Sequence, residues 1–346
     1  MPIVSIVILN WNGRKFLEKF LPSVLLTKYS NLKIYVADNA STDDSIVFLE
    51  QKYPTIKIIR NNQNYGFATG YNQALKNIES DYYVLLNSDV EVSENWIEPI
   101  INLMEKEPQI AICQPKILAY HNKKKFEYAG AAGGFIDSFG YPFCRGRLFD
   151  VCETDSGQYD NVCPIFWASG AAMFVRANVY KQMGGLDDDF FAHMEEIDFC
   201  WRVQRAGFLL LYCPQSVVYH VGGGTLQKSN PYKTYLNFRN NLAMLYKNLK
   251  WYQMCIVFPI RLLLDMVAAF RFLWSKEKGL FKAILKAYFD FWSQISKWQK
   301  KRNETASNIK NKLKNNRDKS QNIKGRYKGS IVLAHFLRKK QYFSDL

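Results

Sequence analysis

Apolar and polar residues follow two different periods along the first third of the chain. Continuous apolar runs rich in β-branched residues predict buried strands at residues 2–13, 32–41, 56–62, 82–92 and 110–118. Segments with apolar residues at helical spacing predict helices between them, at residues 14–27, 43–53, 67–79 and 94–107. Strands that alternate with helices over short connections pair in parallel through right-handed crossovers. The pattern therefore predicts an α/β fold around a mostly parallel central sheet.

The pattern changes after the fifth predicted strand. Residues 120–164 are rich in Gly, aromatic and turn residues and are too polar for a parallel sheet, so we expect an insertion there. Residues 166–185 predict one more strand and a short helix that starts near Arg176. Two strand-like runs then surround Pro214 and end at His220, before three glycines.

From about residue 231 the sequence predicts helices with aromatic stripes. The segment 251–274 is nearly apolar enough to cross a membrane, but Arg261, Asp265 and Arg271 interrupt it. Charges at the centre of a span are costly, so an amphipathic helix lying on a bilayer fits this segment better. Packing of these helices on the rest of the protein is the open alternative.

Positive charge is concentrated near the C-terminal end. The formal net charge is +15, and residues 276–346 hold 19 Lys and Arg against 5 Asp and Glu. Residues 301–346 are predicted to form a basic, partly flexible tail. Because aromatic helices precede this tail, we expect it to support attachment to a membrane surface, and we expect no binding of nucleic acid.

Composition, the first residues and the cysteine spacing indicate which class of protein this is. A hydrophobic content of 48% over 346 residues is ample for a packed core. The chain opens on a strand-like run and not on a secretory signal, so we expect a cytoplasmic protein. The seven Cys have no C-x-x-C spacing, which argues against a disulfide framework or a zinc knuckle.

Polar clusters sit at the carboxyl ends of three of the predicted strands. They are Asn10–Asn12, Asp38–Ser41 and Asn87–Asp89. In open α/β sheets ligands bind beyond the carboxyl ends of the strands. We therefore expect the three clusters to line one ligand site, with the insertion lying over it.

Acidic residues are unusually dense in residues 184–202, GGLDDDFFAHMEEIDFCWR. Read as a loop that enters a helix, this segment places Glu195 and Asp198 on one face and Glu196 on an apolar face. Desolvation raises the pKa of a carboxyl group, which suits Glu196 to general-base chemistry. The alternative is ordinary acidic charge at a helix N-terminus, with an Asp198–Arg202 ion pair.

These motifs, in this order, resemble the inverting family 2 glycosyltransferases of the GT-A fold, especially rhamnosyltransferase-like bacterial members. They are VSIVILNWNG, VADNASTDDS, NNQNYGFATGYNQAL, YVLLNSDVEV, WASGAAMFVRANVYKQMGGLDDDFFAHMEEIDFCWRVQRAG and VYHVGG, within about residues 3–225. The resemblance implies a GT-A catalytic domain at 1–230, with 120–165 as an insertion on the acceptor side. A helical, membrane-associating segment at 231–300 and the tail at 301–346 complete the predicted organisation.

The resemblance implies a nucleotide-sugar donor and assigns its contacts. Leu9 and Trp11 match the strand end that contacts the base, and Asp38 matches the acid that holds the base or its ribose. Gly66 and Asn72 match the loop that closes on the nucleotide. Core packing for Trp11, turn formation at Asp38 and a plain strand–helix connection for the loop are the structural alternatives.

A divalent cation, Mg²⁺ or Mn²⁺, is the second implication of the resemblance. The family's DxD element matches Asn87-Ser88-Asp89, in which Asn87 replaces the first Asp. Asp89 matches the metal-contacting position and His220 matches the family's late metal-ligand histidine. The loss of charge at position 87 leaves its contact with the donor ribose or the metal open.

The acidic pair matches the family's catalytic element, which makes Glu196 the predicted general base. Glu195 is the competing candidate, and Asp198 is expected to orient the site or to serve the structure. In the implied reaction Glu196 takes a proton from an acceptor hydroxyl, and one displacement inverts the anomeric configuration.

The resulting hypothesis is an inverting hexosyltransferase of cell-surface polysaccharide synthesis. We expect a dTDP-sugar such as dTDP-rhamnose, or a UDP-sugar, as donor, a glycan or lipid-linked acceptor, and a position on the inner face of the cell membrane. A nucleotidyltransferase is the rival enzyme, although residues 10–15 match a Gly-rich phosphate loop poorly. A non-catalytic membrane-surface or nucleic-acid-binding protein led by the basic tail is the rival of another class.

Overall fold

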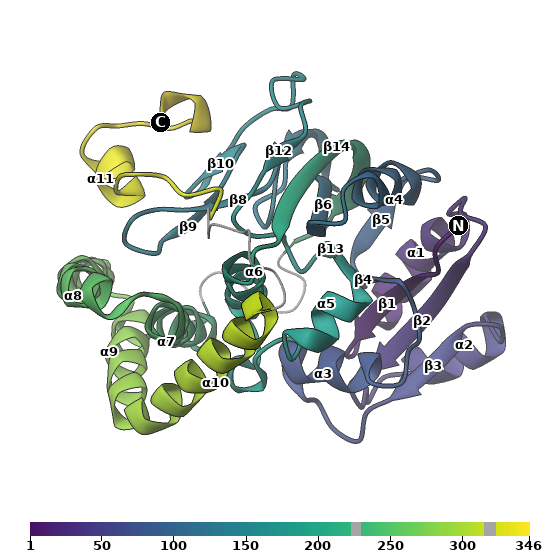
Figure 1. The fold of residues 1–346 in the computed structure, drawn as a ribbon, viewed down its shortest axis with the longest axis horizontal. Helices are drawn as coiled ribbons and strands as arrows, with labels where there is room; N and C mark the ends of the chain where they lie inside the picture. Colours follow the sequence, from purple (N-terminus) through teal and green to yellow (C-terminus); the bar gives the residue numbers. More distant parts are fainter. Residues whose placement is uncertain (223–229, 315–322) are drawn as a thin grey trace.

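The computed structural model describes residues 1–222, 230–314 and 323–346, and its centre is one mixed sheet (Figure 1). Its strands are β1 (Val4–Asn10), β2 (Leu32–Asp38), β3 (Lys57–Arg60), β4 (Tyr82–Asn87), β5 (Val90–Val92), β6 (Ile110–Ala119), β7 (Asn122–Phe126), β12 (Cys163–Pro164), β13 (Ala172–Arg176) and β14 (Leu209–His220). They run in the order β12-β14-β6-β13-β4-β1-β2-β3, with β5 on β14 and β7 on β6. The predicted α/β class is confirmed.

The pairing is parallel only in part. β4, β1, β2 and β3 are parallel neighbours, and so are β6 and β14. β13 lies between β4 and β6 and is antiparallel to both. The chain enters β13 from the insertion and not from a crossover helix, which would have made the strand parallel to its neighbours. The expected mostly parallel sheet is therefore a mixed one.

Helices cover both faces of the sheet and bury two separate cores. The helices of this region are α1 (Arg14–Leu25), α2 (Ser45–Lys52), α3 (Gly66–Leu75), α4 (Ile97–Lys106), α5 (Ala177–Gln182) and α6 (Glu195–Arg205). Within β4, Val84 belongs to the core that α1, α2 and α4 share, whereas its neighbour Leu85 belongs to the core that α3, α5 and α6 share. Alternate strand residues point to opposite faces, so apolar residues at every position are needed to fill both cores.

The insertion contributes to two sheets. β7 and β12 extend the central sheet as antiparallel partners of β6 and β14. The remaining strands, β8 (Gly134–Ile136), β9 (Pro142–Cys144), β10 (Arg147–Leu148) and β11 (Val151–Cys152), form a separate antiparallel sheet. The chain after residue 322 lies on this small sheet: Ile136 N–H donates to the Gly325 carbonyl at 3.1 Å, and Tyr327 N–H donates to the Ile136 carbonyl at 2.9 Å.

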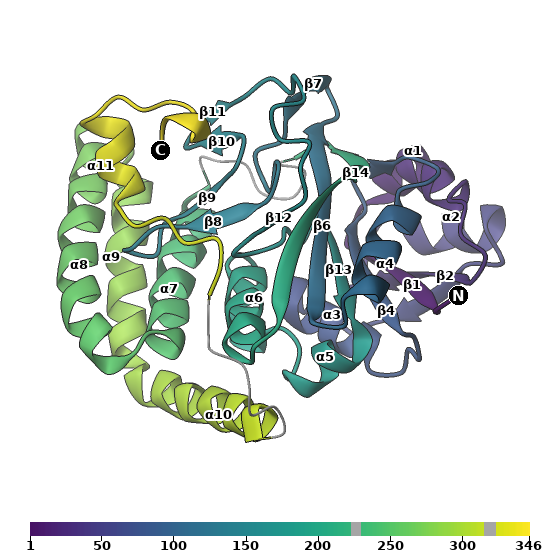
Figure 2. The same cartoon turned by 45° about the horizontal axis from the view of Figure 1, so that its top comes forward.

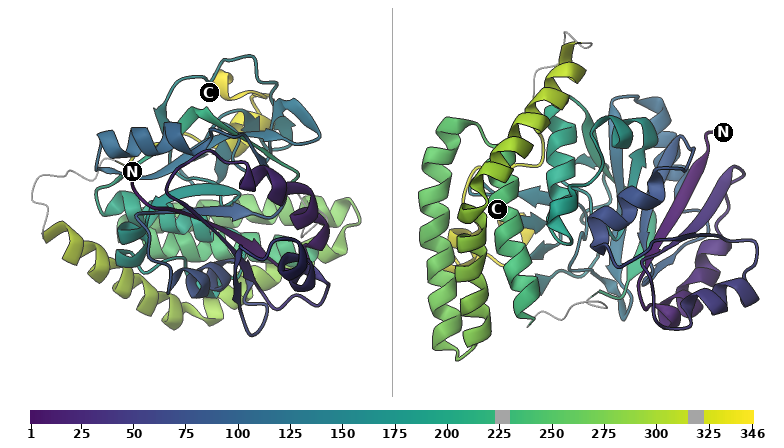
Figure 3. Two further views of the ribbon diagram at one scale, coloured as in Figure 1. Left: turned by 90° about the vertical axis from the view of Figure 1, so that its right-hand side faces the viewer. Right: turned by 90° about the horizontal axis from the view of Figure 1, so that it is seen from below.

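A layer of helices closes the side of the molecule away from the N-terminus (Figures 2 and 3). It consists of α7 (Pro231–Asn248), α8 (Trp251–Trp274), α9 (Lys278–Ser293) and α10 (Ile295–Lys314), with α11 (Ile331–Phe336) near α8. α10 continues through residue 300, so residues 301–314 belong to this layer and not to a separate tail. Residues 315–322 of the predicted tail lie outside the described residues. No helix among the described residues is long and apolar enough to cross a membrane.

Candidate active site

The register of the central sheet brings the predicted polar clusters together. Asn10, the last residue of β1, is the register partner of Asp38, and Leu9 is the register partner of Asn87. The predicted strand at 82–92 is interrupted at residues 88 and 89, where the chain turns from β4 into β5. Parallel pairing with equal strand ends thus places all three clusters at one edge.

Asp38 is buried and holds the turn that follows β2. Its Oδ1 accepts hydrogen bonds from Asn10 Nδ2 at 3.0 Å and from the Ser41 hydroxyl at 2.5 Å, and its Oδ2 accepts from Ser41 N–H at 2.9 Å. The turn-forming alternative for Asp38 is therefore real in the structure. Trp11, directly after β1, leaves 46% of its surface exposed at the same edge, which does not agree with core packing.

Gly66 lets α3 approach the loop before α6, and Gly70 lets it approach the strand ends. Gly66 has φ +72°, and a Cβ there would lie 2.5 Å from the ring of Phe191. A Cβ on Gly70 would lie 2.8 Å from the Asn39 amide and 3.0 Å from Leu9. Glycine is needed at both positions because any larger side chain would push α3 away.

The structure corrects the donor-binding role predicted for Asn72. Its amide oxygen accepts from the Tyr180 hydroxyl at 2.7 Å and from Leu186 N–H at 3.1 Å. Its amide nitrogen donates to the Leu186 carbonyl at 2.8 Å and to Asp188 at 2.6 Å. These four bonds use the hydrogen-bonding capacity of the amide, so Asn72 ties α3 to the loop before α6 instead of facing a ligand.

Antiparallel pairing of β5 with β14 joins Asp89 to His220. Nε2 of His220 lies 3.2 Å from Oδ1 of Asp89 and 3.4 Å from the amide nitrogen of Asn87. Asp89 and His220 are both buried. The two predicted metal positions and Asn87 therefore form one polar cluster, although Gly223 and Gly224 of the glycine run after His220 lie outside the described residues.

Glu127 is part of this cluster and has no counterpart in the sequence motifs. Its Oε2 lies 3.2 Å from Nδ1 of His220 and accepts a hydrogen bond from Ala129 N–H at 2.5 Å. The side chain is buried, and the close approach of Gly222 leaves no room for a Cβ at that position. The sequence signal for Glu127 is weak, a single acid after the basic run Lys123–Lys125.

The charges around His220 favour a cation. Burial lowers the pKa of His220, but the carboxylates of Asp89 and Glu127 outweigh it and raise the pKa to about 10. Burial likewise raises the pKa of Asp89, and the imidazole of His220 more than compensates, so that the pKa is lowered. Two carboxylates that hold a proton on the imidazole would equally hold a metal ion in place of that proton.

The geometry of the pair fits a divalent cation. Adjacent ligands of an octahedral ion, each at about 2.1 Å, lie about 3.0 Å apart. The 3.2 Å between Asp89 and His220 agrees with two such positions. Within the described part of the chain no group of three or more His, Cys, Asp and Glu side chains forms a metal-binding cluster, so donor phosphate oxygens and water would have to complete the coordination.

Glu195 and Glu196 open α6 in an environment with few partners. Glu195 is buried and Glu196 is half-buried as a residue, and Oε2 of both carboxyl groups is shielded from solvent. Among the described residues, Oε2 of each carboxyl finds no hydrogen-bond donor. Burial raises the pKa of Glu196 to about 7, and burial together with the charge of Glu196 raises the pKa of Glu195 well above its ordinary value.

A strained turn at residues 191–194 positions the acidic pair at the start of α6. Phe191, His193 and Met194 have φ values of 62°, 69° and 72°, a region that non-glycine residues rarely adopt and that costs about 1–3 kcal/mol for each. Asn240 of α7, fully buried, holds this turn by donating from Nδ2 to the carbonyls of Phe190, Ala192 and His193 at 2.8–2.9 Å. The helical layer therefore fixes the entry into α6.

Asp198, named with Glu195 and Glu196 as a residue of the acidic segment, is fully buried and held by three donors, which fits the orienting or structural role expected for it. Its Oδ2 accepts from Arg202 Nε and from Lys247 Nζ, both at 2.8 Å, and its Oδ1 accepts from Asn248 Nδ2 at 2.8 Å. The i,i+4 pair with Arg202 is the alternative that the sequence left open. Lys247 also binds Asp187 at 2.5 Å, and Lys301 of α10 pairs with the same Asp187.

Residues 168–171 connect helix α6, which carries the acidic pair, to the polar cluster around His220. Ala168 N–H donates to Cys200 Sγ of α6 at 3.4 Å, and the Ser169 hydroxyl donates to the Ala129 carbonyl at 2.6 Å. The Ala171 carbonyl accepts from Asn87 N–H at 3.0 Å. Cys200 lies one turn after Glu196 on the same face of α6, so this segment connects the acidic helix to the Asp89–His220 cluster.

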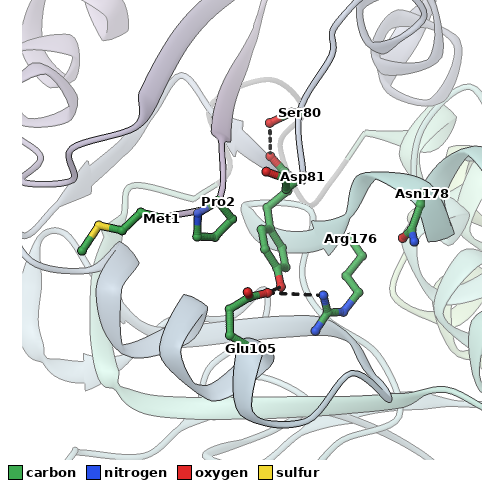
Figure 4. Close-up of a pocket in the computed structure, with 8 residues that line it drawn as sticks. Met1, Pro2, Ser80, Asp81, Glu105, Arg176 and Asn178 are labelled. Atoms are coloured by element: carbon green, nitrogen blue, oxygen red, sulfur yellow. Dashed lines mark hydrogen bonds and ion pairs between the residues drawn. The ribbon is translucent and has the colours of Figure 1, made fainter.

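A hollow of about 570 Å³ lies at the opposite end of the sheet, where β1 and β4 begin. Figure 4 shows Glu105 and Arg176 facing each other there, 3.5 Å apart. The Tyr82 hydroxyl also donates to Glu105. These groups satisfy one another at the amino ends of the strands, so the hollow carries none of the predicted chemistry.

Two family profiles match the chain. The profile described as Glycosyl transferase family 2 matches residues 5–155, and that described as Glycosyl transferase family group 2 matches residues 82–298, more than half of the chain. The chain is a family 2 glycosyltransferase. Family 2 enzymes invert the anomeric configuration of the transferred sugar, so the predicted enzyme class is confirmed.

Curated relatives of this glycosyltransferase carry rhamnosyltransferase names. It is 24% identical over 234 residues to the N-acetylglucosaminyl-diphospho-decaprenol L-rhamnosyltransferase of Mycobacterium tuberculosis, which covers 63% of this chain and 76% of the relative. It is 25% identical over 221 residues to the rhamnosyltransferase WbbL of Escherichia coli, which covers 61% of this chain and 81% of that protein.

Solved structures with the same fold include two glycosyltransferases bound to Mn²⁺. The mannosyltransferase PcManGT from Pyrobaculum calidifontis, in complex with GDP-Man and Mn²⁺, aligns with a TM-score of 0.52 at 12% identity over 91% of this chain and 88% of that one. GalNAc-T7 with UDP, GalNAc and Mn²⁺ aligns with a TM-score of 0.55 at 16% identity over 71% of this chain and 48% of that one. At these identities the likeness establishes the GT-A fold.

Proposed function

We propose that this glycosyltransferase moves a hexose, with rhamnose as the first candidate, from a nucleoside diphosphate to a hydroxyl of a lipid-linked glycan in cell-surface polysaccharide synthesis. The observation that carries the proposal is the half-buried Glu196, whose carboxyl has a pKa of about 7 and an Oε2 with no donor among the described residues. A base with a pKa near the working pH is suited to accept a proton in the transition state.

The donor would lie along the strand ends. The exposed ring of Trp11 offers a surface on which the base can stack, and Leu9 lies beside it at the end of β1. The Asp38 carboxylate, already fixed by Asn10 and Ser41, would accept a hydrogen bond from the base or the ribose. Gly66, with φ +72°, would give the loop that closes on the nucleotide its turn into α3.

Asp89 and His220 would hold a divalent cation, Mg²⁺ or Mn²⁺, at the diphosphate end of the donor. When bound, such an ion neutralises the charge that develops on the departing phosphate oxygens. Asn87, uncharged and 3.4 Å from His220, would contribute a hydrogen bond and no charge to this end of the site. Glu127 would fix the imidazole ring from its other nitrogen.

The reaction would proceed as a single displacement. Glu196 takes the proton of the acceptor hydroxyl as that oxygen forms its bond to the anomeric carbon. The bond from this carbon to the diphosphate oxygen breaks at the same time, and the electron pair leaves with the nucleoside diphosphate. Attack from the face opposite the leaving group inverts the configuration, and the proton remains on Glu196 until solvent removes it.

The acceptor is proposed from the relatives, since the name of the Mycobacterium tuberculosis protein specifies a diphospho-decaprenol substrate. A lipid-linked acceptor of this kind would place the enzyme at the inner face of the cell membrane.

The function is tested by offering the purified chain a panel of nucleotide sugars, dTDP-rhamnose first, with Mg²⁺ or Mn²⁺, and by measuring release of the nucleoside diphosphate. We expect release that requires a metal ion and that is lost in Asp89→Asn. Equal release in the presence of a strong chelator, or none from any donor of the panel, would contradict the proposal.

A further inference from the structure

Helix α8 carries its charges on the face that packs against the protein. Its buried residues recur every fourth position, at Val257, Arg261, Asp265 and Ala269. Arg261 pairs with Asp265 at 3.0 Å, and Asp265 accepts hydrogen bonds from the hydroxyls of Tyr141 at 2.6 Å and Tyr288 at 2.8 Å. Two of the charges that interrupt the apolar segment are thus neutralised inside the protein.

The outward face of α8 and α9 is correspondingly apolar. Leu263 is 65% exposed, Phe289 73% and Trp274 90%. The other exposed large apolar residues of the two helices are Trp251, Tyr252, Ile256, Leu262, Val267, Phe270, Leu273, Leu285 and Trp292. Contacts between the rings of Phe270 and Phe281, at 6.0 Å, join the two helices into one surface, here named the α8–α9 face.

Cations surround one end of the α8–α9 face. The exposed charged residues between the middle of α8 and residue 286 of α9 are Arg271, Lys276, Glu277, Lys278, Lys282 and Lys286, five cations against one acid. α11 extends this end, because the Arg271 guanidinium lies 5.4 Å from the ring centre of Phe336, beside the exposed Leu337. Figure 2 shows α8 and α11 together at the edge of the molecule farthest from the N-terminus.

We propose that the α8–α9 face docks on an anionic lipid bilayer, with the helices lying in the interface plane. Exposed Trp and Phe side chains enter the boundary between headgroups and acyl chains, and a basic rim is attracted to anionic headgroups. A second copy of the chain would bring two equally basic rims together, which opposes self-association through this face. The inference extends the proposed function, because a lipid-linked acceptor would be presented at this surface.

The test compares the wild-type chain with the double variant Leu263→Glu and Phe289→Glu. Val47→Glu is the matched control, since Val47 is 52% exposed on α2, at the other side of the molecule. Binding is measured by co-sedimentation with vesicles of phosphatidylcholine alone and of equal parts phosphatidylcholine and phosphatidylglycerol. Light scattering gives the mass of each protein in solution, and circular dichroism checks its folding.

The wild type and Val47→Glu should bind the vesicles that contain phosphatidylglycerol, and the double variant should bind at least about tenfold more weakly. Binding should fall with salt and should be weaker on phosphatidylcholine alone. Failure of the wild type to bind either vesicle, or equal binding by the double variant, would overturn the proposal. A wild-type dimer that the double variant dissociates would overturn it in favour of a second copy. Release of nucleoside diphosphate by the folded double variant shows that the transferase site survives, which separates this proposal from the proposed function.

Discussion

Nδ1 of His220 lies 3.2 Å from Glu127, on the opposite side of the imidazole from Asp89. A carboxylate in this position orients a histidine ligand and raises its basicity, and removal of such a partner typically weakens metal binding by about 10–100-fold. We predict that the affinity of Glu127→Gln for Mn²⁺ falls by this factor, as measured by titration followed by electron paramagnetic resonance in the absence of the nucleotide sugar.

Glu91→Gln is the matched control for that titration, because Glu91 pairs with Lys123 on the surface of β5. Its Mn²⁺ affinity should equal that of the wild type. If Glu127→Gln bound Mn²⁺ as tightly as the control, Glu127 would have no part in the metal site.

Lys247 links α7 to both Asp187 and Asp198, and all three side chains are buried. Truncation of one partner of a buried ion network leaves uncompensated charge and costs about 3–5 kcal/mol. We predict a decrease of this size in the free energy of unfolding of Lys247→Met, measured by urea denaturation. Lys28→Met removes an exposed pair with Glu94 and should cost at most about 1 kcal/mol; equal losses in the two variants would refute the structural role of the network.

The fold followed from the sequence wherever the determining signal was local. The strand ends at Asn10 and Asp38 lie close to the ends of apolar runs visible in the chain, whereas the end at Asn87 is a turn inside a run predicted as one strand. Short crossovers bring the three ends together. The antiparallel entry of β13 was not predictable in this way, because it depends on which gap in the sheet the chain enters after the insertion.

The site was predictable to a similar extent. Asp89, His220 and Glu196 stand in motifs that the family resemblance identifies. The role of Asp198 depends on Lys247 and Asn248, and that of Asn72 on Tyr180, partners that no local pattern connects to them. Glu127 is missed for the same reason, since only the β6–β7 hairpin places it beside His220.

The raised pKa of Glu196 predicts the pH dependence of the reaction. Burial favours the neutral form up to about pH 7, and only the carboxylate can accept a proton. The rate of transfer at saturating donor should therefore rise with pH and level off above the pKa of about 7. A rate that is constant from about pH 5 to about pH 8, under conditions where the chemical step limits turnover, would exclude Glu196 as the base.

The raised pKa of Glu196 also predicts how the free energy of unfolding changes with pH. In the unfolded chain the Glu196 carboxyl ionises near its ordinary pKa of 4.5, whereas in the folded chain it retains its proton up to about 7. The folded state then binds more protons between these values, so the contribution of Glu196 to stability is full below pH 4.5 and is lost as the pH rises through 7. Glu196→Gln should be more stable than the wild type at about pH 8, and the difference should shrink on acidification. Unfolding curves at several pH values measure this; a variant less stable than the wild type at about pH 8 would contradict burial of the carboxylate.

Comparison of Glu196→Gln with Glu195→Gln in transfer to an acceptor shows which acid takes the acceptor proton, with the affinity for the nucleoside diphosphate measured in parallel. We predict that Glu196→Gln lowers the rate of transfer by about 10²-fold or more and leaves nucleotide binding unchanged. Glu195→Gln should retain most of the rate, because Glu195 of the wild type is buried whereas Glu196 is half-buried. Loss of transfer in Glu195→Gln with activity retained in Glu196→Gln would contradict the central claim that Glu196 takes the acceptor proton.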